Sequence, residues 1–315
     1  MTVRWGILSA ANIAKQQVIP AIAANGGKIQ AIASRSQIVR DLVVQYEIEH
    51  VYTTYEALLA SDIDAVYIAL PNSLHFEWVM KALEYGKHVL VEKPIVLEMQ
   101  QMVAIKEKAE AEHLIVMEAF MYRFHPQIEE AKKMLDAGEI GEIVSMRSQF
   151  HFVLDNWEND IRISSNLGGG VLYDIGCYCL NIQQYMLSDK IEDANLSSLT
   201  WNDVDVKVAG QIRYKNGVIG TIDCSFCGYF TETFDVIGTK GRLRLPHAFR
   251  TDVNNHVGIV EVHKENKIQQ YEYQGNAYRL QIAHFEQAIQ GKPVSYCLER
   301  ITEQVQSLEF LHDKL

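Results

Sequence analysis

The first 120 residues alternate short apolar runs with longer segments in which apolar residues recur at helical spacing. Strands that alternate with helices in this way are typical of βαβ units, whose strands lie parallel in one sheet. The apolar runs predict six strands, at residues 3–8, 29–33, 50–53, 65–70, 88–92 and 114–118. Helices are predicted between them, at residues 13–25, 37–46, 55–60, 74–85 and 98–112. We therefore expect an α/β domain with a doubly wound parallel sheet over residues 1–121.

After residue 126 the pattern changes to one helix, at 127–137, and a series of runs in which apolar and polar residues alternate. Such alternation predicts strands with one buried face. Asn216 and Gly217 lie between two of these runs, which is a strong hairpin signal. The expected strands are 142–153, 206–214, 218–226, 231–237, 241–245, 257–263 and 268–273, and helices follow at 277–290 and 298–311. The second domain, residues 122–315, is thus expected to be α+β with a large open-faced, mainly antiparallel sheet.

The apolar positions of one predicted strand also indicate self-association. Val206, Val208, Ile212 and Tyr214 alternate along this strand, and the chain offers few helices that could cover them. A large apolar face needs a cover, and a homodimer is the simplest closed arrangement that supplies one. We expect this domain to bind the substrate and to form a homodimer through its sheet.

Composition and charge narrow the function mainly by exclusion. The net charge is −11 without a basic cluster, which argues against a nucleic-acid partner and favours a small-molecule ligand. No stretch approaches the ~18 apolar residues that a membrane span requires. Five cysteines, an odd number, suit a reducing compartment, so we expect a cytoplasmic protein. Cys224 and Cys227 lie three apart in strand-like sequence and should point to opposite faces, so we expect no metal site.

The turn after the first predicted strand is rich in small residues. Ser9, Ala11 and Ala14 occupy the three glycine positions of a GxGxxG pattern. In a dinucleotide-binding (Rossmann) fold, this turn places the pyrophosphate over backbone N–H groups at a helix N-terminus. We therefore expect the turn to bind a dinucleotide cofactor through Ser9, Ala11, Asn12 and Ile13.

The end of the second predicted strand indicates which dinucleotide is bound. An NAD-binding protein places an acid here on the ribose 2′-hydroxyl, but this chain has Ser34, Arg35 and Ser36. A planar cation and two hydroxyls suit a 2′-phosphate, so NADP is favoured over NAD. The alternative is that Arg35 is a solvated surface residue.

Polar residues also follow the fourth and fifth predicted strands, and ligands of open α/β sheets bind at the carboxyl ends of strands. We assign to the cofactor site Pro71, Asn72 and His75 after the fourth strand, and Glu92 and Lys93 after the fifth. Helix capping would also explain Asn72. We expect the bond between Lys93 and Pro94 to be cis, which would turn the lysine out of the strand.

Three glycines, residues 168–170, precede a helical pattern that carries Asp174 and Tyr178 four residues apart on one face. A tyrosine with an ordinary pKa near ~10 is a poor acid or base at neutral pH, but a nearby lysine cation lowers that pKa. Lys93 could supply the charge, and Asp174 could hold the lysine or a substrate hydroxyl. Spacing alone also allows a structural Lys–Asp pair and a core tyrosine.

In order along the chain, these segments resemble the Gfo/Idh/MocA oxidoreductases, and in particular the branch of dimeric dihydrodiol dehydrogenases and NADP-dependent D-xylose dehydrogenases. The resemblance covers nearly the whole chain, at residues 6–14, 33–36, 71–75, 92–94, 118–126 and 168–181. It implies a Rossmann domain, an open-faced sheet domain and hydride exchange at a carbinol or carbonyl carbon. Lys93 matches the family's EKP lysine, and Tyr178 stands where many members have histidine. Ser9 and Ala11 stand where many members have glycine.

We therefore expect an NADP-dependent oxidoreductase for a small polyhydroxylated substrate, which could be a sugar, an inositol or a dihydrodiol. Tyr178 would be the general acid/base, Lys93 its pKa-lowering partner and Asp174 the orienting group, while Arg123 and Arg162 would join these three in contacting the substrate. Two other classes stay open: a non-catalytic NADP-binding regulator that responds to sugars, and an NAD-dependent glycosidase of the same fold. The sequence does not identify the substrate, the physiological direction, assembly beyond a dimer, or whether Tyr178 or Lys93 donates the proton.

Overall fold

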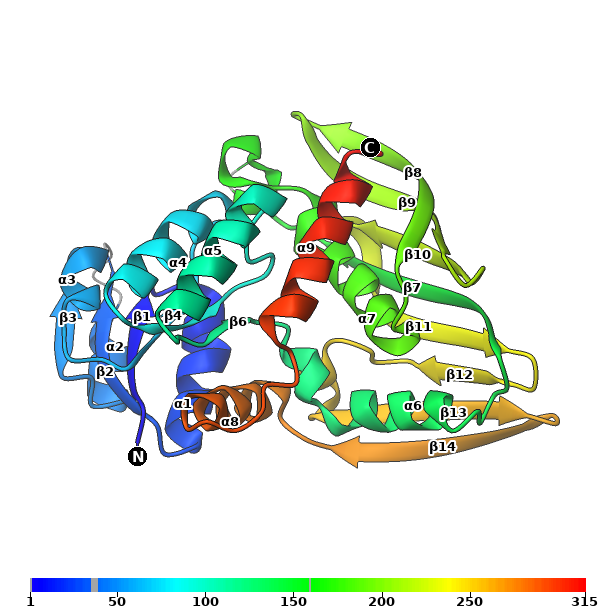
Figure 1. The fold of residues 1–315 in the computed structure, drawn as a ribbon, viewed down its shortest axis with the longest axis horizontal. Helices are drawn as coiled ribbons and strands as arrows, with labels where there is room; N and C mark the ends of the chain where they lie inside the picture. Colours follow the sequence, from blue (N-terminus) through cyan, green and yellow to red (C-terminus); the bar gives the residue numbers. More distant parts are fainter. Residues whose placement is uncertain (1, 35–38, 159) are drawn as a thin grey trace. The chain divides into compact units, whose positions relative to one another are not determined.

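The computed structural model describes residues 2–34, 39–158 and 160–315, and the chain divides into two units (Figure 1). The first unit comprises Met1–Phe120 and Tyr278–Val305, and the second comprises Met121–Ala277 and Gln306–Leu315. The sequence pattern instead predicted a second domain over all of residues 122–315. The difference arises because helix α8 (Ala277–Ile289) packs on the first strand, where Phe285 lies 5.2 Å from the Trp5 ring and Glu286 accepts a 2.9 Å hydrogen bond from the Trp5 indole.

The first unit is built on a six-stranded parallel sheet with strand order β3-β2-β1-β4-β5-β6. Its strands are β1 (Arg4–Leu8), β2 (Lys28–Ala33), β3 (His50–Tyr52), β4 (Ala65–Ile68), β5 (His88–Val91) and β6 (Val116–Glu118). All six predicted strands are present, and the doubly wound fold is confirmed. The strand order reverses at β1 and β4, which is where open α/β sheets form their ligand crevice.

Helices connect these strands as predicted, with shorter ends. They are the π-helix η1 (Ala14–Val18), α1 (Ile19–Ala24), α2 (Arg40–Gln45), α3 (Tyr55–Leu59), the 3-10 turn η3 (Asn72–Leu74), α4 (His75–Glu84) and α5 (Met99–Ala111). The chain ends with α9 (Leu298–His312), whose first residues belong to the first unit and whose last residues belong to the second. In the described part of the chain, no helix has the length and apolar character to cross a membrane.

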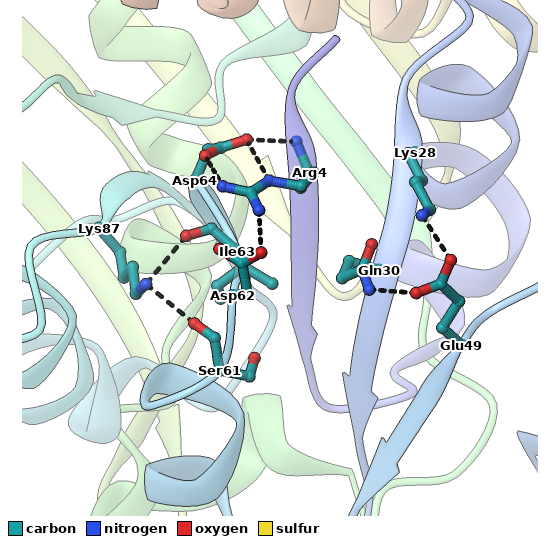
Figure 2. Close-up of polar contacts among 9 residues, drawn as sticks. All are labelled: Arg4, Lys28, Gln30, Glu49, Ser61, Asp62, Ile63, Asp64 and Lys87. Atoms are coloured by element: carbon teal, nitrogen blue, oxygen red, sulfur yellow. Dashed lines mark hydrogen bonds and ion pairs between the residues drawn. The ribbon is translucent and has the colours of Figure 1, made fainter.

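A cluster of ion pairs lies at the amino ends of the parallel strands (Figure 2). Arg4 donates from Nη2 to Asp64 Oδ1 at 2.7 Å, and its backbone N–H donates to Asp64 Oδ2 at 2.8 Å. Lys87 Nζ donates to the carbonyls of Ser61 (3.0 Å) and Ile63 (2.9 Å). Because ligands of such sheets bind at the opposite, carboxyl ends of the strands, we assign this cluster to the stability of the first unit.

Replacing Asp64 by Asn should lower the thermal midpoint at neutral pH without changing cofactor binding. The hydrogen bond from Arg4 holds the pKa of Asp64 below its ordinary value, so its stabilisation is present above the ordinary pKa and is lost as pH falls through the folded pKa. Thermal melts from pH 7 down to strong acid should show the gap between wild type and variant closing. A matched change at the largely exposed Asp62 should have a smaller effect, and a gap independent of pH would contradict the assignment.

The second unit contains helix α6 (Pro126–Asp136) and an eight-stranded sheet with strand order β14-β13-β12-β11-β7-β10-β9-β8. Its strands are β7 (Ile143–Val153), β8 (Ile191–Trp201), β9 (Val204–Tyr214), β10 (Ile219–Ser225), β11 (Cys227–Gly238), β12 (Arg242–Leu245), β13 (Val257–Lys264) and β14 (Lys267–Gln274). Only the β7–β10 pair is parallel among the described strand pairs of this sheet, so the mainly antiparallel α+β domain is confirmed. Strand β8, an edge strand of mostly exposed side chains, was not among the predicted strands.

Helices α6 and α7 (Cys177–Leu187) cover one face of this sheet (Figure 1). The four residues of the predicted apolar face are buried, with Val208, Ile212 and Tyr214 fully so and Val206 8% exposed. Tyr214 also donates a 3.1 Å hydrogen bond to Gln183 of α7. These four residues are already buried within a single copy, so the expectation that they need a second copy as their cover is wrong, while the homodimer itself stays a prediction.

The cysteines and possible metal ligands are spread through the structure. All five cysteines are thiols. Cys224 is buried on β10, whereas Cys227 is exposed at the start of β11, so the two do not face one ion. Among the described residues, no group of three or more His, Cys, Asp or Glu side chains is arranged to hold a metal.

Candidate active site

The turn between β1 and η1 has the conformation expected of a pyrophosphate loop. Ser9 has φ 78°, the left-handed region in which glycine is favoured, and its backbone N–H donates to the Ala33 carbonyl at 3.0 Å. The side chains of Ala11 and Ile13 are half-buried, and that of Asn12 is exposed. The turn therefore keeps the left-handed backbone of the glycine pattern at Ser9, although Ser9, Ala11 and Ala14 replace its three glycines.

The predicted 2′-phosphate site follows β2. Ser34 is half-buried, and its backbone N–H donates to the Tyr52 carbonyl at 3.2 Å, which fixes the end of the strand. Arg35 and Ser36 lie outside the described residues. Their assignment to the 2′-phosphate stays a prediction.

His75 connects the loops that follow β4 and β5. Its ring is fully buried, with Nδ1 2.7 Å from the Pro94 carbonyl and Nε2 2.8 Å from the Leu70 carbonyl. Burial lowers the pKa of His75, while the two carbonyls act in the opposite direction. Both ring nitrogens are thus occupied by backbone, so we interpret His75 as holding the two loops together rather than contacting the cofactor itself.

Capping does not explain Asn72. Helix α4 begins at His75, its N-cap is Leu74, and no side chain caps it. Asn72 instead opens the 3-10 turn η3 that follows Pro71, and both residues are half-buried at the carboxyl end of β4. The capping alternative is therefore wrong, and the position at the strand end keeps both residues in the candidate cofactor site.

The loop after β5 carries Lys93, which is half-buried. Glu92 accepts a 2.6 Å hydrogen bond from the Tyr67 hydroxyl of β4. The Lys93–Pro94 bond is cis, so that prediction is confirmed. Glu92 is thus fixed to the neighbouring strand next to the lysine.

Glu118 anchors the far side of the same loop, and the sequence analysis missed it. This fully buried carboxylate accepts hydrogen bonds from the Ile95 backbone N–H at 2.9 Å and from the Tyr296 hydroxyl at 2.7 Å. An acid at the end of an apolar strand was the available signal, since a buried carboxylate requires polar partners. Glu92 and Glu118 together leave the loop around Lys93 little freedom.

In the second unit, Tyr178 lies on α7 among aromatic side chains. Its ring is 5.5 Å from Phe249 and 5.7 Å from both Tyr122 and Phe150, measured between ring centroids. The hydroxyl lies 3.7 Å from the Met121 sulfur, and the residue is 7% exposed. These contacts fix the direction of the phenol while leaving part of it accessible.

Asp174 lies in the π-helix η7 (Leu172–Gly176), which leads directly into α7. Single π-helical turns occur frequently at functional sites. Arg162 donates from Nε to Asp174 Oδ2 at 2.8 Å and from Nη1 to Asp160 Oδ1 at 3.2 Å. The two carboxylates raise the pKa of Arg162, and Asp174 is the larger influence. Arg162 is therefore the charge partner of Asp174 and not a purely solvated arginine. Its contact with the substrate stays a prediction.

Arg123 is bound to the same helix. Its guanidinium lies 4.3 Å from the centre of the Tyr185 ring, and Nη1 donates to Asn181 Oδ1 at 3.3 Å. Asn181 Oδ1 also accepts a 2.6 Å hydrogen bond from the Tyr122 hydroxyl. The second unit thus gathers Arg123, Arg162, Asp174 and Tyr178 along η7 and α7, whereas Lys93 belongs to the first unit.

The fold and these residues define a class: an oxidoreductase with a dinucleotide-binding Rossmann unit and a separate sheet unit that carries an Asp-Tyr helix. Residues 3–120 match the family model described as "Oxidoreductase family, NAD-binding Rossmann fold". Residues 128–244 match the "GFO/IDH/MocA C-terminal domain". The chain belongs to the Gfo/Idh/MocA family of oxidoreductases, and the resemblance predicted from the sequence is confirmed.

Several known proteins are similar to this chain. D-xylose 1-dehydrogenase (NADP(+)) 2 of Haloferax volcanii is 39% identical over 252 residues, 79% of this chain and 77% of the relative. Trans-1,2-dihydrobenzene-1,2-diol dehydrogenase of Xenopus tropicalis is 26% identical over 273 residues, 85% of this chain and 81% of the relative. The crystal structure of a 3-ketoreductase from Actinomadura kijaniata, in complex with NADP and TDP-benzene, has a TM-score of 0.90 and 30% identity, covering 98% of this chain and 96% of that one.

Proposed function

We propose that this protein is an NADP-dependent oxidoreductase that exchanges a hydride at a carbinol or carbonyl carbon of a small polyhydroxylated substrate. The observation that carries the proposal is the helix on which Tyr178 is oriented by aromatic rings and Asp174 is paired with Arg162. The similar proteins whose names include D-xylose, dihydrobenzenediol or NADP support the substrate class and the cofactor.

The residues at the carboxyl ends of the parallel strands fit a dinucleotide. The left-handed backbone at Ser9 and the small side chain of Ala11 allow a pyrophosphate to approach the helix N-terminus. When bound, NADP supplies or accepts the hydride at its nicotinamide C4. We assign cofactor binding to Ser9, Ala11, Asn12, Ile13, Ser34, Arg35, Ser36, Pro71, Asn72, Glu92 and Lys93, with His75 holding the loops in place.

In this proposal the protein's own residues position the substrate and move one proton. Tyr178 takes the proton from the carbinol, or returns it to the carbonyl oxygen, through its hydroxyl. Lys93 supplies the positive charge that favours the phenolate. Asp174, held by Arg162, orients the lysine or a substrate hydroxyl, and Arg123 contacts the substrate beside them.

A panel of aldoses, inositols and dihydrodiols, each assayed with NADP for the reduced-nicotinamide absorbance band, tests this proposal. At least one compound should give turnover that depends on Tyr178. NADP binding without turnover of any compound would favour a sugar-responsive regulator instead. Release of nitrophenol from a nitrophenyl glycoside, with NAD and without net reduction, would favour a glycosidase.

The cofactor choice gives a prediction of its own. Arg35→Ala should weaken NADP binding roughly ten- to hundredfold and leave NAD binding unchanged, because a charge-assisted contact to phosphate is worth ~1.5–3 kcal/mol. Fluorescence titration with both dinucleotides measures the difference. Equal affinities for NAD and NADP in the wild type, or an unaltered NADP affinity in the variant, would contradict the assignment of NADP.

We also propose a cytoplasmic homodimer that forms through the sheet face opposite α6 and α7. Charged side chains that pair with one another on that face support this interface. Arg242 donates from Nε to Asp235 at 2.8 Å, and His151 Nε2 lies 3.7 Å from Asp223 Oδ1. Arg244 Nε likewise lies 3.8 Å from Asp235 Oδ1, so this face carries paired charges that a polar partner surface could meet. The five thiols support a reducing compartment.

Light scattering during size-exclusion chromatography should give a mass of twice 35.9 kDa at micromolar concentration. Thr221→Arg, which adds a bulky charge to β10 on that face, should shift the protein toward the monomer. The matched control is Asp136→Arg at the exposed end of α6, which should leave the mass unchanged. A monomeric wild type, or a Thr221→Arg variant that dimerises normally, would contradict this interface.

A further inference from the structure

Asp205 is a buried carboxylate that the proposed mechanism does not use. It lies on β9 and is 7% exposed. Its Oδ2 accepts a 2.7 Å hydrogen bond from the Leu172 backbone N–H, and the neighbouring Val171 backbone N–H also favours the charged form of the carboxyl group. These two amides begin the helix that carries Asp174. The first N–H groups of a helix lack partners within it, and a negative charge there is favoured by the helix dipole.

The same carboxylate is coupled to the glycine run. Gly170 has φ 131°, and a Cβ at this position would lie 2.3 Å from Asp205 Oδ1, so only glycine leaves room for the carboxylate. The Gly170 backbone N–H donates to the Arg162 carbonyl at 2.9 Å, and its carbonyl accepts from the Asp174 N–H at 2.9 Å. The backbone of Gly170 thus connects Arg162 with Asp174. The Asp205 carboxylate lies against the same glycine.

Stability alone does not account for a charged group at this position. Burial raises the pKa of Asp205 to about 6, and the hydrogen bonds from Leu172 only partly offset that effect. Because the folded pKa lies above the ordinary value, the contribution of Asp205 to stability is full below the ordinary pKa and is lost as pH rises through about 6. At neutral pH the carboxylate therefore lowers the free energy of unfolding relative to its acid form, and its contacts with the Leu172 N–H and with Gly170 indicate a role in placing the helix.

Few other titratable groups lie near Asp205. His312 of α9 acts on it electrostatically, and its ring stacks on Tyr173 at 4.9 Å. Cys224 of β10 is buried, and burial raises the pKa of this thiol well above its ordinary value. On the helix itself, Asp174 is paired with Arg162. Of these titratable side chains, that of Asp205 accepts a hydrogen bond from a backbone N–H of the first helical turn.

We propose that Asp205 is a positioning residue that fixes the first turn of the η7–α7 helix and thereby sets the places of Asp174 and Tyr178. Protonation of Asp205 is favoured in the closed, folded turn, so acid alters the contact with the Leu172 amide without opening the turn. The kinetic consequences rest on the function proposed above, whereas the effect on the helix does not.

Asp205→Asn tests the proposal because it keeps the size of the side chain and removes the charge. We expect kcat to fall roughly tenfold, since small displacements of catalytic groups have effects of that order or larger, while the KM for NADP stays unchanged. The wild type should lose kcat on the acid side with a midpoint near pH 6, and the variant should lack that acid limb. Asp203→Asn in the same β8–β9 hairpin is the matched control and should behave as wild type.

Hydrogen exchange of the amides of residues 171–174 gives a second readout that requires no turnover. After correction for intrinsic rates, exchange at pH 7 should be faster in Asp205→Ala, which removes the acceptor of the Leu172 N–H. In the wild type, exchange should slow as pH falls through about 6, because the protonated side chain favours the closed turn. The wild-type measurement tests the proposal even if the variant does not fold. Exchange unaffected by pH and by the substitution would overturn the proposal, whereas a wild type without turnover of any substrate would overturn only the proposed function.

Discussion

Replacing Tyr178 by Phe should reduce kcat by roughly 10²–10⁴-fold, the usual contribution of a positioned acid/base group. Phe keeps the ring contacts with Phe150, Phe249 and Tyr122 that fix the side chain. It removes only the hydroxyl, whose contact with the Met121 sulfur is long at 3.7 Å. The variant should therefore fold normally, lose proton transfer and keep its affinity for NADP, as steady-state kinetics and a cofactor titration would measure.

A second hydroxyl on the same helix provides the control. Tyr185→Phe, seven residues further along α7, leaves the ring beneath Arg123 and should retain most of the turnover. Similar losses in both variants would indicate that removal of any hydroxyl disturbs the helix. Near-normal turnover of Tyr178→Phe would show that Tyr178 is not the acid/base.

Most strands of the parallel sheet could be predicted because they are short apolar runs that the fold buries almost completely, as with Ala65–Ile68, whereas the short edge strand β3 is largely exposed. Strand β8 could not, because an edge strand with exposed side chains lacks both a continuous apolar run and a clear alternation. The apolar alternation of β9 correctly indicated one buried face. It did not indicate which element buries that face, since alternation is a property of one strand and its cover depends on tertiary packing.

The candidate site likewise contains residues that the sequence predicts and residues that it does not. Lys93, Asp174 and Tyr178 could be found from local motifs, since each lies within a few residues of glycines, a proline or a strand end. The groups that hold them could not. Glu118 reaches Tyr296 across 178 positions of the sequence, and Asp205 reaches Leu172 across 33. Only the folded chain specifies such partners. A sequence can therefore indicate that an acid is buried, but not which groups it binds.

The roles of Lys93 and Tyr178 can be separated with Lys93→Met, which keeps an unbranched side chain and removes the charge. We expect turnover to fall by a factor comparable to that of Tyr178→Phe, because both substitutions act on the same proton transfer. The residual activity should also move to higher pH, because the cation that favours the phenolate is gone. The loop itself should persist, since Glu92 is held by Tyr67 and Ile95 by Glu118.

A pH–rate profile of each variant distinguishes the two assignments. If Tyr178 is the acid/base, Tyr178→Phe abolishes the pH-dependent step and Lys93→Met displaces it. If Lys93→Met instead abolishes turnover while Tyr178→Phe remains near normal, the lysine itself transfers the proton and the two roles must be exchanged. Asp174→Asn, which weakens the pair with Arg162, should reduce turnover in either case, because both assignments require the carboxylate to orient the group that carries the proton.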